Sequence, residues 1–92
     1  MIKSFACRDT EHLFKSIAVP RFKNIESTAR KKLLMIHAAT MLVTLKVPPG
    51  NKLEALRGDR RGQHSVRIND QWRICFVWKA DGAHDVEIVD YH

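Results

Sequence analysis

The sequence predicts an α+β domain in which two helices precede a small antiparallel sheet. Apolar residues recur at three- and four-residue steps before residue 48, as in helices that bury one side, and alternate with other residues after it, as in strands. The break between the two patterns lies at 48–51, which reads Pro-Pro-Gly-Asn. The connections between the predicted strands are too short for crossover helices. We therefore expect a meander with two N-terminal helices packed on one face, in a single domain over residues 1–92.

A short strand and a helix are expected at the start of the chain. Residues 2–7 predict the strand. The helix is expected to take Asp9 or Thr10 as its N-cap and to end by Val19, because the residue before a proline disfavours the helical conformation. The side chains predicted to form its buried stripe are Leu13, Phe14 and Ile17.

The second helix has the strongest helical pattern in the chain. Asn24 is its expected N-cap, and the helix is expected to end near Ala39 or Thr40. The basic residues 30–32 lie mostly off the apolar stripe. The predicted stripe consists of Ile25, Ala29, Leu33 and Ile36.

Three alternating segments predict the main strands of the sheet. Turn residues separate them at 58–62, 69–70 and 80–82. These short connections predict antiparallel neighbours joined by tight turns. The apolar pairs that define the three segments are Val66 and Ile68, Ile74 and Phe76, and Val86 and Ile88.

The charge of the chain indicates a polyanionic partner. Lys and Arg outnumber Asp and Glu by 16 to 10, which gives a formal charge of +6 and a pI near 9.8. Residues 1–50 contain nine basic and only three acidic side chains. Small basic domains of this kind typically bind nucleic acid, although a protein that its charge merely keeps in solution has the same composition. Composition leaves both explanations open.

The composition points away from disulfides, bound metals and membranes. Cys7 and Cys75 are far apart in sequence and are expected to be free thiols in a reducing cytoplasm. There is no Cys-x-x-Cys motif and no histidine pair at metal-ligand spacing, so neither a metal nor a cofactor is expected. The longest run without charges, residues 33–45, is shorter than the roughly 20 residues needed to span a bilayer, and the N-terminus does not resemble a secretory signal. We expect a cytoplasmic protein.

The candidate chemistry lies on the strand that contains Arg73 and at the end of the chain. If Trp72 and Ile74 face the helices, Arg73 points to the open face of the sheet. There it is either solvated or ion-paired, or it binds a phosphate through its planar guanidinium. Tyr91 and His92 follow the last predicted strand and would reach the rim of the sheet. An imidazole, a phenol and a guanidinium together can cleave RNA without a metal.

The chain resembles the HigB toxins, members of the RelE/ParE superfamily of bacterial type II toxin–antitoxin systems. The likeness covers essentially the whole chain and is most specific in residues 71–76 (Gln-Trp-Arg-Ile-Cys-Phe) and 90–92 (Asp-Tyr-His). Further matching residues are Met1, Ile2, Ser4, Phe5, residues 48–51, Leu53, Glu54, Gly58 and residues 65–69.

This resemblance implies a RelE-like fold and an endoribonuclease activity. HigB-like toxins enter the ribosomal A site and cut mRNA through attack of the ribose 2′-hydroxyl, which leaves a 2′,3′-cyclic phosphate. The residues that match their catalytic cluster are Arg73, Asp90, Tyr91, His92 and, as a basic residue, Arg57.

The segment 53–58 (Leu-Glu-Ala-Leu-Arg-Gly) departs from the family pattern. Several relatives have Leu-His-Pro-Leu-Lys-Gly here, so Glu54 replaces a histidine and Arg57 replaces a lysine. Arg57 preserves the positive charge but is too basic to donate a proton at neutral pH. Glu54 is either a base for the 2′-hydroxyl or the ion-pair partner of a nearby arginine, and both hypotheses are open.

From the chemistry of these residues, we assign a hypothetical role to each member of the cluster. Arg57 and Arg73 would stabilise the phosphate, and His92 would act as acid or base. Tyr91 would stack on or orient a base, and Asp90 would orient its neighbours. Further candidates for contact with RNA are Arg60, Arg61, Arg67 and His64.

The resemblance also implies partners. These are a HigA-like helix-turn-helix antitoxin, the ribosome with its A-site rRNA, mRNA, and operator DNA indirectly through the antitoxin. Residues 30–32 are available to rRNA or to an acidic antitoxin. Two alternatives stay open at this point: a ParE-like gyrase poison without nuclease activity, and a non-catalytic basic module that binds nucleic acid.

Overall fold

The structure is a computed structural model that describes residues 1–91. In this part of the chain the regular elements are α1 (Arg8–Phe14), α2 (Glu26–Ala38), β1 (Glu54–Ala55), β2 (His64–Arg67), β3 (Trp72–Lys79) and β4 (Gly82–Asp90). Short 3₁₀ helices are η1 (Pro20–Ile25), η2 (Leu42–Lys46), η3 (Pro49–Asn51) and η4 (Gly58–Arg60).

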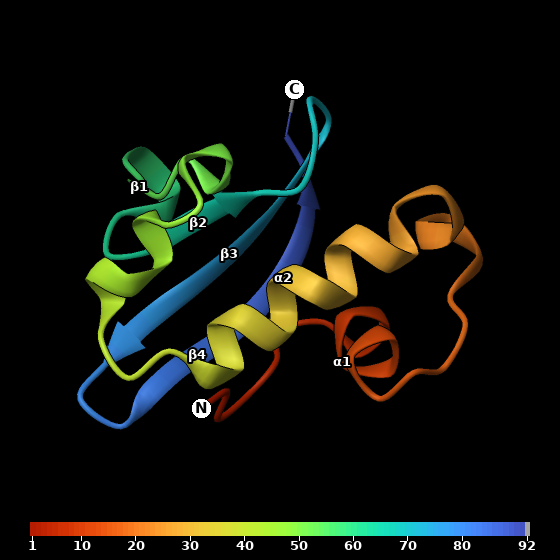
Figure 1. The fold of residues 1–92 in the computed structure, drawn as a ribbon, viewed down its shortest axis with the longest axis horizontal. Helices are drawn as coiled ribbons and strands as arrows, with labels where there is room; N and C mark the ends of the chain where they lie inside the picture. The colour runs from red at the N-terminus through yellow and green to blue at the C-terminus, as the bar shows by residue number, and fades with distance from the viewer. Residues whose placement is uncertain (92) are drawn as a thin grey trace.

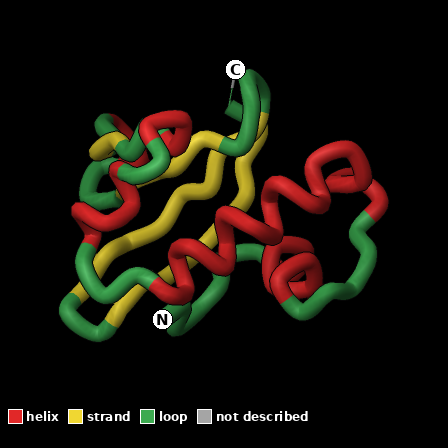
Figure 2. The backbone as a smooth tube through the Cα atoms, viewed as in Figure 1, coloured by secondary structure: helices red, strands yellow, loops and turns green. Residues whose placement is uncertain are grey.

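The strands form one antiparallel sheet in the order β1-β2-β3-β4. Both α1 and α2 lie on the same side of this sheet, and both contact β4 (Figure 1). Figure 2 shows the short helical turns of the middle segment beside the edge of the sheet formed by β1 and β2. The predicted α+β architecture, a meander with two N-terminal helices on one face, is confirmed.

One apolar core fills the space between the helices and the sheet. The register pairs Val66 with Ile74 and Ile74 with Ile88, so these three side chains form a buried row on the helix-facing side. The predicted stripe of the second helix is buried against this row, as expected from its spacing. Its members are Ile25, Ala29, Leu33 and Ile36.

The first helix is shorter than predicted. It begins after Cys7 without a side-chain cap, so Asp9 and Thr10 are not its N-cap. It ends at Phe14, because Ser16 adopts the left-handed conformation (φ 64°) and its amide donates to the Leu13 carbonyl at 3.0 Å. The next amide bonds back to the carbonyl of residue 12, which completes a Schellman motif. The chain thus leaves the helix before Ile17, whose side chain is 47% exposed and not buried as expected.

The second helix also begins differently from the prediction. Pro20 starts the 3₁₀ helix η1, which runs directly into α2, so the N-cap position falls on Ile25 and not on Asn24. The end of α2 at Ala38 agrees with the prediction to within one residue.

The N-terminal segment does not form the predicted strand. Residues 2–7 make only isolated parallel bridges to β4, through Ile2 with Ala83 and Phe5 with Val86. The stretch of β4 between these bridges contains Asp85 in a left-handed conformation (φ 52°), beside a shift in register with β3. This irregularity interrupts continuous pairing. The two-residue strand β1 was not anticipated, since so short a segment has no periodicity to detect.

No helix in the described part of the chain is long and apolar enough to cross a lipid bilayer.

The close approach of Met1 to Gly82 provides a test of this arrangement. Gly82 has a φ of +135°, and a Cβ added there would overlap the carbonyl oxygen of Met1, which accepts the Ala83 amide at 3.0 Å. We expect Gly82→Ala to lower the free energy of unfolding by about 2 kcal/mol or more. The measurement is urea denaturation. Gly50→Ala is the matched control, because a Cβ at Gly50 meets no atom within 4 Å. Equal effects of the two substitutions would contradict this docking.

Candidate active site

A polar row crosses the face of the sheet opposite the helices. The register pairs Glu54 with Ser65, Ser65 with Cys75, and Cys75 with Glu87. Ser65 and Cys75 are buried because the connection between β1 and β2 folds over this face, where Arg60 Nη1 lies 3.3 Å from Glu87 Oε1. Burial raises the pKa of the Cys75 thiol, which is therefore neutral at physiological pH.

Arg73 lies next to this row and is only 8% exposed, so the open environment expected for it is wrong. Its Nε donates to Ser65 Oγ at 2.7 Å, and its Nη2 donates to the Lys52 carbonyl at 2.7 Å. Lys52 adopts the left-handed conformation (φ 44°) in the turn between η3 and β1. The guanidinium is thus held in one position by acceptors from two separate segments.

Glu54 forms an ion pair with Arg73, with 3.6 Å between Oε1 and Nη2. The side chain of Glu54 is 49% exposed, whereas that of Arg73 is 10% exposed. Of the two hypotheses for Glu54, the ion pair is therefore observed. The carboxylate also faces solvent, where an incoming hydroxyl group can reach it.

The ring of Tyr91 also lies close to this arginine. Arg73 pairs with Val89 in the register, so Tyr91 follows two residues later on the same face. The Arg73 guanidinium carbon lies 5.7 Å from the centroid of the Tyr91 ring, which is a cation–π distance. The structure therefore brings together three of the predicted residues: Glu54, Arg73 and Tyr91.

Asp90 belongs to the opposite row. It pairs with Trp72, whose side chain packs against the core, and its Oδ2 accepts from Gln71 Nε2 at 3.0 Å. Its carboxylate is thus placed at the end of the sheet and not in the group around Arg73. His92 lies outside the described residues.

The remaining predicted arginines differ in how they are engaged. Arg57 and Arg61 are exposed, and within residues 1–91 they form no side-chain hydrogen bond or ion pair. Arg60 is paired with Glu87, and Arg67 with Asp70. Two of the four arginines therefore retain uncompensated charge.

His64 faces the helix side of the sheet and does not join Arg73. Its ring stacks on Phe76 at 6.4 Å between centroids, and its Nδ1 is buried without a hydrogen-bond partner in the described structure. With Leu42, Val43 and Leu53 it lines a mainly apolar cavity of about 410 Å³ beside β1, and Glu54 also lines this cavity.

Residues 7–92 match the family described as the RelE-like toxin of the type II toxin–antitoxin system HigB. The chain belongs to this HigB-like family. Toxin HigB-1 from Vibrio cholerae serotype O1 (strain ATCC 39315 / El Tor Inaba N16961) is 38% identical over 69 residues, which are 75% of this chain and 72% of that protein. The resemblance inferred from the motifs is confirmed.

A solved structure shares the fold of this HigB-like chain. The YoeB–YefM complex from Staphylococcus aureus contains a chain that superposes with a TM-score of 0.58 at 18% identity, over 100% of this chain and 95% of that one. At this level of identity the likeness shows the fold, and it agrees with the RelE-like architecture expected from the sequence.

Two contributors to the site of this HigB-like chain were missed from its sequence. Ser65 lies two residues before Arg67 on β2, and Arg67 pairs with Arg73, so the alternation of side chains places Ser65 on the same face as Arg73. Nothing in the sequence, however, marks its hydroxyl as the acceptor for Arg73 Nε. The Lys52 carbonyl has no sequence signal, because its direction depends on a left-handed turn at a lysine. Within residues 1–91, no three His, Cys, Asp or Glu side chains are grouped as metal ligands require.

The hydrogen bond from Arg73 to Ser65 can be tested through stability. Ser65→Ala removes the acceptor at 2.7 Å and leaves a buried charged donor unpaired, so we expect a loss of about 1.5–3 kcal/mol in the free energy of unfolding. In an Arg73→Met background, Ser65→Ala should lower the free energy of unfolding by at least about 1 kcal/mol less than it does in the wild-type chain. The measurement is a double-mutant cycle with urea denaturation. Additive costs would show that Ser65 acts independently of the arginine.

Proposed function

We propose that this HigB-like chain is a ribosome-dependent mRNA endoribonuclease that inhibits translation. The observation that supports this most directly is the group formed by Glu54, Arg73 and Tyr91, in which a fixed guanidinium contacts both an exposed carboxylate and an exposed ring. Family membership supports the toxin class. The group supplies a base and a fixed cation for metal-independent RNA cleavage, and in this proposal His92 supplies the acid.

The proposed reaction is attack of a ribose 2′-oxygen on the adjacent phosphorus. Glu54 accepts the 2′-hydroxyl proton as the new P–O bond forms. The P–O5′ bond breaks, and the leaving 5′-oxygen takes a proton from His92, which yields a 2′,3′-cyclic phosphate and a 5′-hydroxyl. Arg73 stabilises the charge that develops on the phosphate, and its fixed position means that little reorganisation is needed during the reaction. An exchange of acid and base between Glu54 and His92 gives the same products.

Other residues have supporting roles in this proposal. Tyr91 is exposed and stacks on a base next to the cleaved bond, and Asp90 supports the end of β4 through Gln71. Arg57 and Arg61 contact phosphates directly, because they are exposed and carry uncompensated charge. Arg60 and Arg67 would first have to leave their carboxylate partners, and His64 would contribute through the cavity at β1, which Glu54 also lines.

The proposed partners follow from the toxin class. They are a HigA-like helix-turn-helix antitoxin, the ribosomal A site with its rRNA, and operator DNA through the antitoxin, all in the cytoplasm. The YoeB–YefM complex is a related fold solved together with a partner. Neither a gyrase poison of the ParE kind nor a non-catalytic binding module is favoured by the relatives found.

The deciding experiment measures cleavage of mRNA on programmed ribosomes. Glu54→Gln, Arg73→Lys, Arg73→Ala and a chain without His92 should each cleave at least about 100-fold more slowly. Glu54→Gln removes the proton acceptor, the Arg73 variants remove the fixed guanidinium, and the shortened chain lacks the acid. Arg8→Ala on α1 is the control and should cleave at the wild-type rate. Glu54→Gln keeps the proposal testable if the buried Arg73 variants do not fold, since Glu54 is half exposed.

Three outcomes separate the candidate functions. Breaks within codons that depend on Glu54 and Arg73 support the nuclease. Intact mRNA together with double-stranded DNA breaks would show a gyrase poison, and intact mRNA and DNA with tight RNA binding would show a binding module. Wild-type cleavage by Arg73→Lys and by Glu54→Gln would refute the assigned mechanism.

A further inference from the structure

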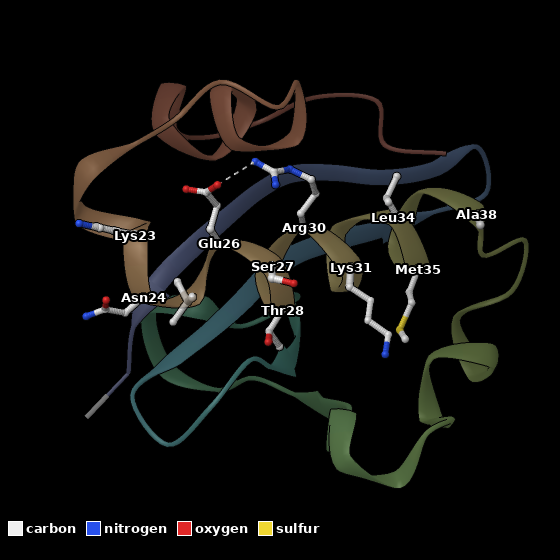
Figure 3. A pocket seen from close by; sticks show the side chains of 11 residues that line it. Lys23, Asn24, Glu26, Ser27, Thr28, Arg30, Lys31, Leu34, Met35 and Ala38 are labelled. Atoms are coloured by element: carbon white, nitrogen blue, oxygen red, sulfur yellow. Dashed lines mark ion pairs between the residues drawn. The ribbon is translucent and has the colours of Figure 1, made fainter.

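Within residues 1–91, the outward side of α2 lines a shallow depression that stays open to solvent. Its volume is about 1020 Å³, and it is lined by residues from Lys23 in η1 to Ala38 at the end of α2. Figure 3 shows α2 running across the front of the molecule, with the lining side chains spread over its exposed surface. On one side Arg30 Nε binds the Leu13 carbonyl of α1, and on the other Lys32 binds Asn51 of η3. We refer to this surface, lined by Lys23, Ser27, Lys31, Leu34, Met35 and Ala38, as the α2 face.

The C-terminal half of the α2 face is apolar. Leu34 is 53% exposed, and it lies next to the half-buried Met35 and the exposed Ala38. Met41, three residues past the end of the helix, is also exposed, at 61%. A contiguous exposed patch of this kind on a small protein typically marks a surface that binds another protein.

The N-terminal half of the α2 face is basic. Arg30 pairs with Glu26 at 3.8 Å, whereas Lys23 and Lys31 form no ion pair within residues 1–91. Burial and the positive charge of Lys31 both lower the pKa of the neighbouring Lys32. The surface therefore has an unbalanced positive potential, which a carboxylate-bearing partner would neutralise.

We propose that the α2 face binds an acidic amphipathic helix from a protein partner, which on the function proposed above is the antitoxin. The exposed side chains Lys31, Leu34 and Ala38 recur at three- and four-residue steps over a helix roughly 20 Å long, and such ridges fit the grooves of a second helix. The partner helix places apolar residues over Leu34, Met35 and Ala38 and carboxylates near Lys23 and Lys31.

Two features favour a protein over RNA as the occupant. Half of the face consists of aliphatic side chains and a thioether, which offer neither hydrogen bonds to phosphate nor flat rings for stacking. In addition, the face lies on the helix side of the sheet, whereas Arg73 and Tyr91 lie on the opposite side. RNA engaged at Arg73 therefore has no need to cross α2.

The test measures, by calorimetry, the Kd between the purified chain and the HigA-like helix-turn-helix antitoxin proposed above as its partner. Leu34→Gln and Lys31→Glu should each raise the Kd at least tenfold, since one removes apolar contact and the other reverses the charge. Matched controls outside the α2 face are Ile17→Gln, at an apolar side chain that is 47% exposed, and Lys79→Glu, at an exposed lysine at the end of β3. Both controls should keep the wild-type Kd.

A photo-crosslinking amino acid at residue 34 should also join the partner, and one at residue 17 should not. The proposal is overturned if the α2 variants bind the partner like the controls, or if they weaken mRNA cleavage while leaving the Kd unchanged, which would make this surface an RNA contact. Cleavage by the wild-type chain is measured in parallel. If mRNA stays intact but the Kd depends on Leu34 and Lys31, the nuclease proposal fails and the docking site stands.

Discussion

The buried guanidinium of Arg73 is the group on which the arrangement of the candidate site depends. A cation with so little contact with water needs acceptors close to it, and these come from Ser65 on β2 and from the Lys52 carbonyl before β1. Glu54 then compensates the charge from the solvent side. These contacts connect the turn after η3 and the edge strand to the centre of the sheet, so the site and the sheet edge are one structural unit.

The alternation of side chains along the strands separates two surfaces with different chemistry. Val66, Ile74 and Ile88 point to the helices and exclude water, whereas Ser65, Arg73 and their neighbours on the other face form polar contacts. The same division places the proposed cleavage site and the proposed docking surface on α2 on opposite sides of the sheet. A chain of 92 residues can therefore contact RNA and a protein partner through surfaces that do not overlap.

Most errors in the sequence prediction concern the ends of elements and not their type. The periodicity of Ile25, Ala29, Leu33 and Ile36 identified the second helix correctly, because packing against a core requires that spacing. The predicted caps were wrong, because a left-handed Ser16 and a 3₁₀ turn beginning at Pro20 set the helix boundaries instead. Residues 2–7 have strand composition, but pairing along β4 is interrupted where Asp85 is left-handed. Such backbone conformations depend on neighbours that are distant in sequence.

The sequence by itself determined the fold class, the order of helices and strands, the family, and the face of the sheet on which Arg73 lies, since periodicity and motifs are local properties of the chain. Only the tertiary structure decided that Arg73 is buried and not open, that Glu54 and Tyr91 flank it while Asp90 lies in the opposite row, and that Lys52 supplies an acceptor. The surroundings of Arg73 depend on the register between the strands and on the direction of the Lys52 carbonyl. Contacts between residues distant in sequence set both, such as the one between Arg73 and Lys52, which are 21 positions apart.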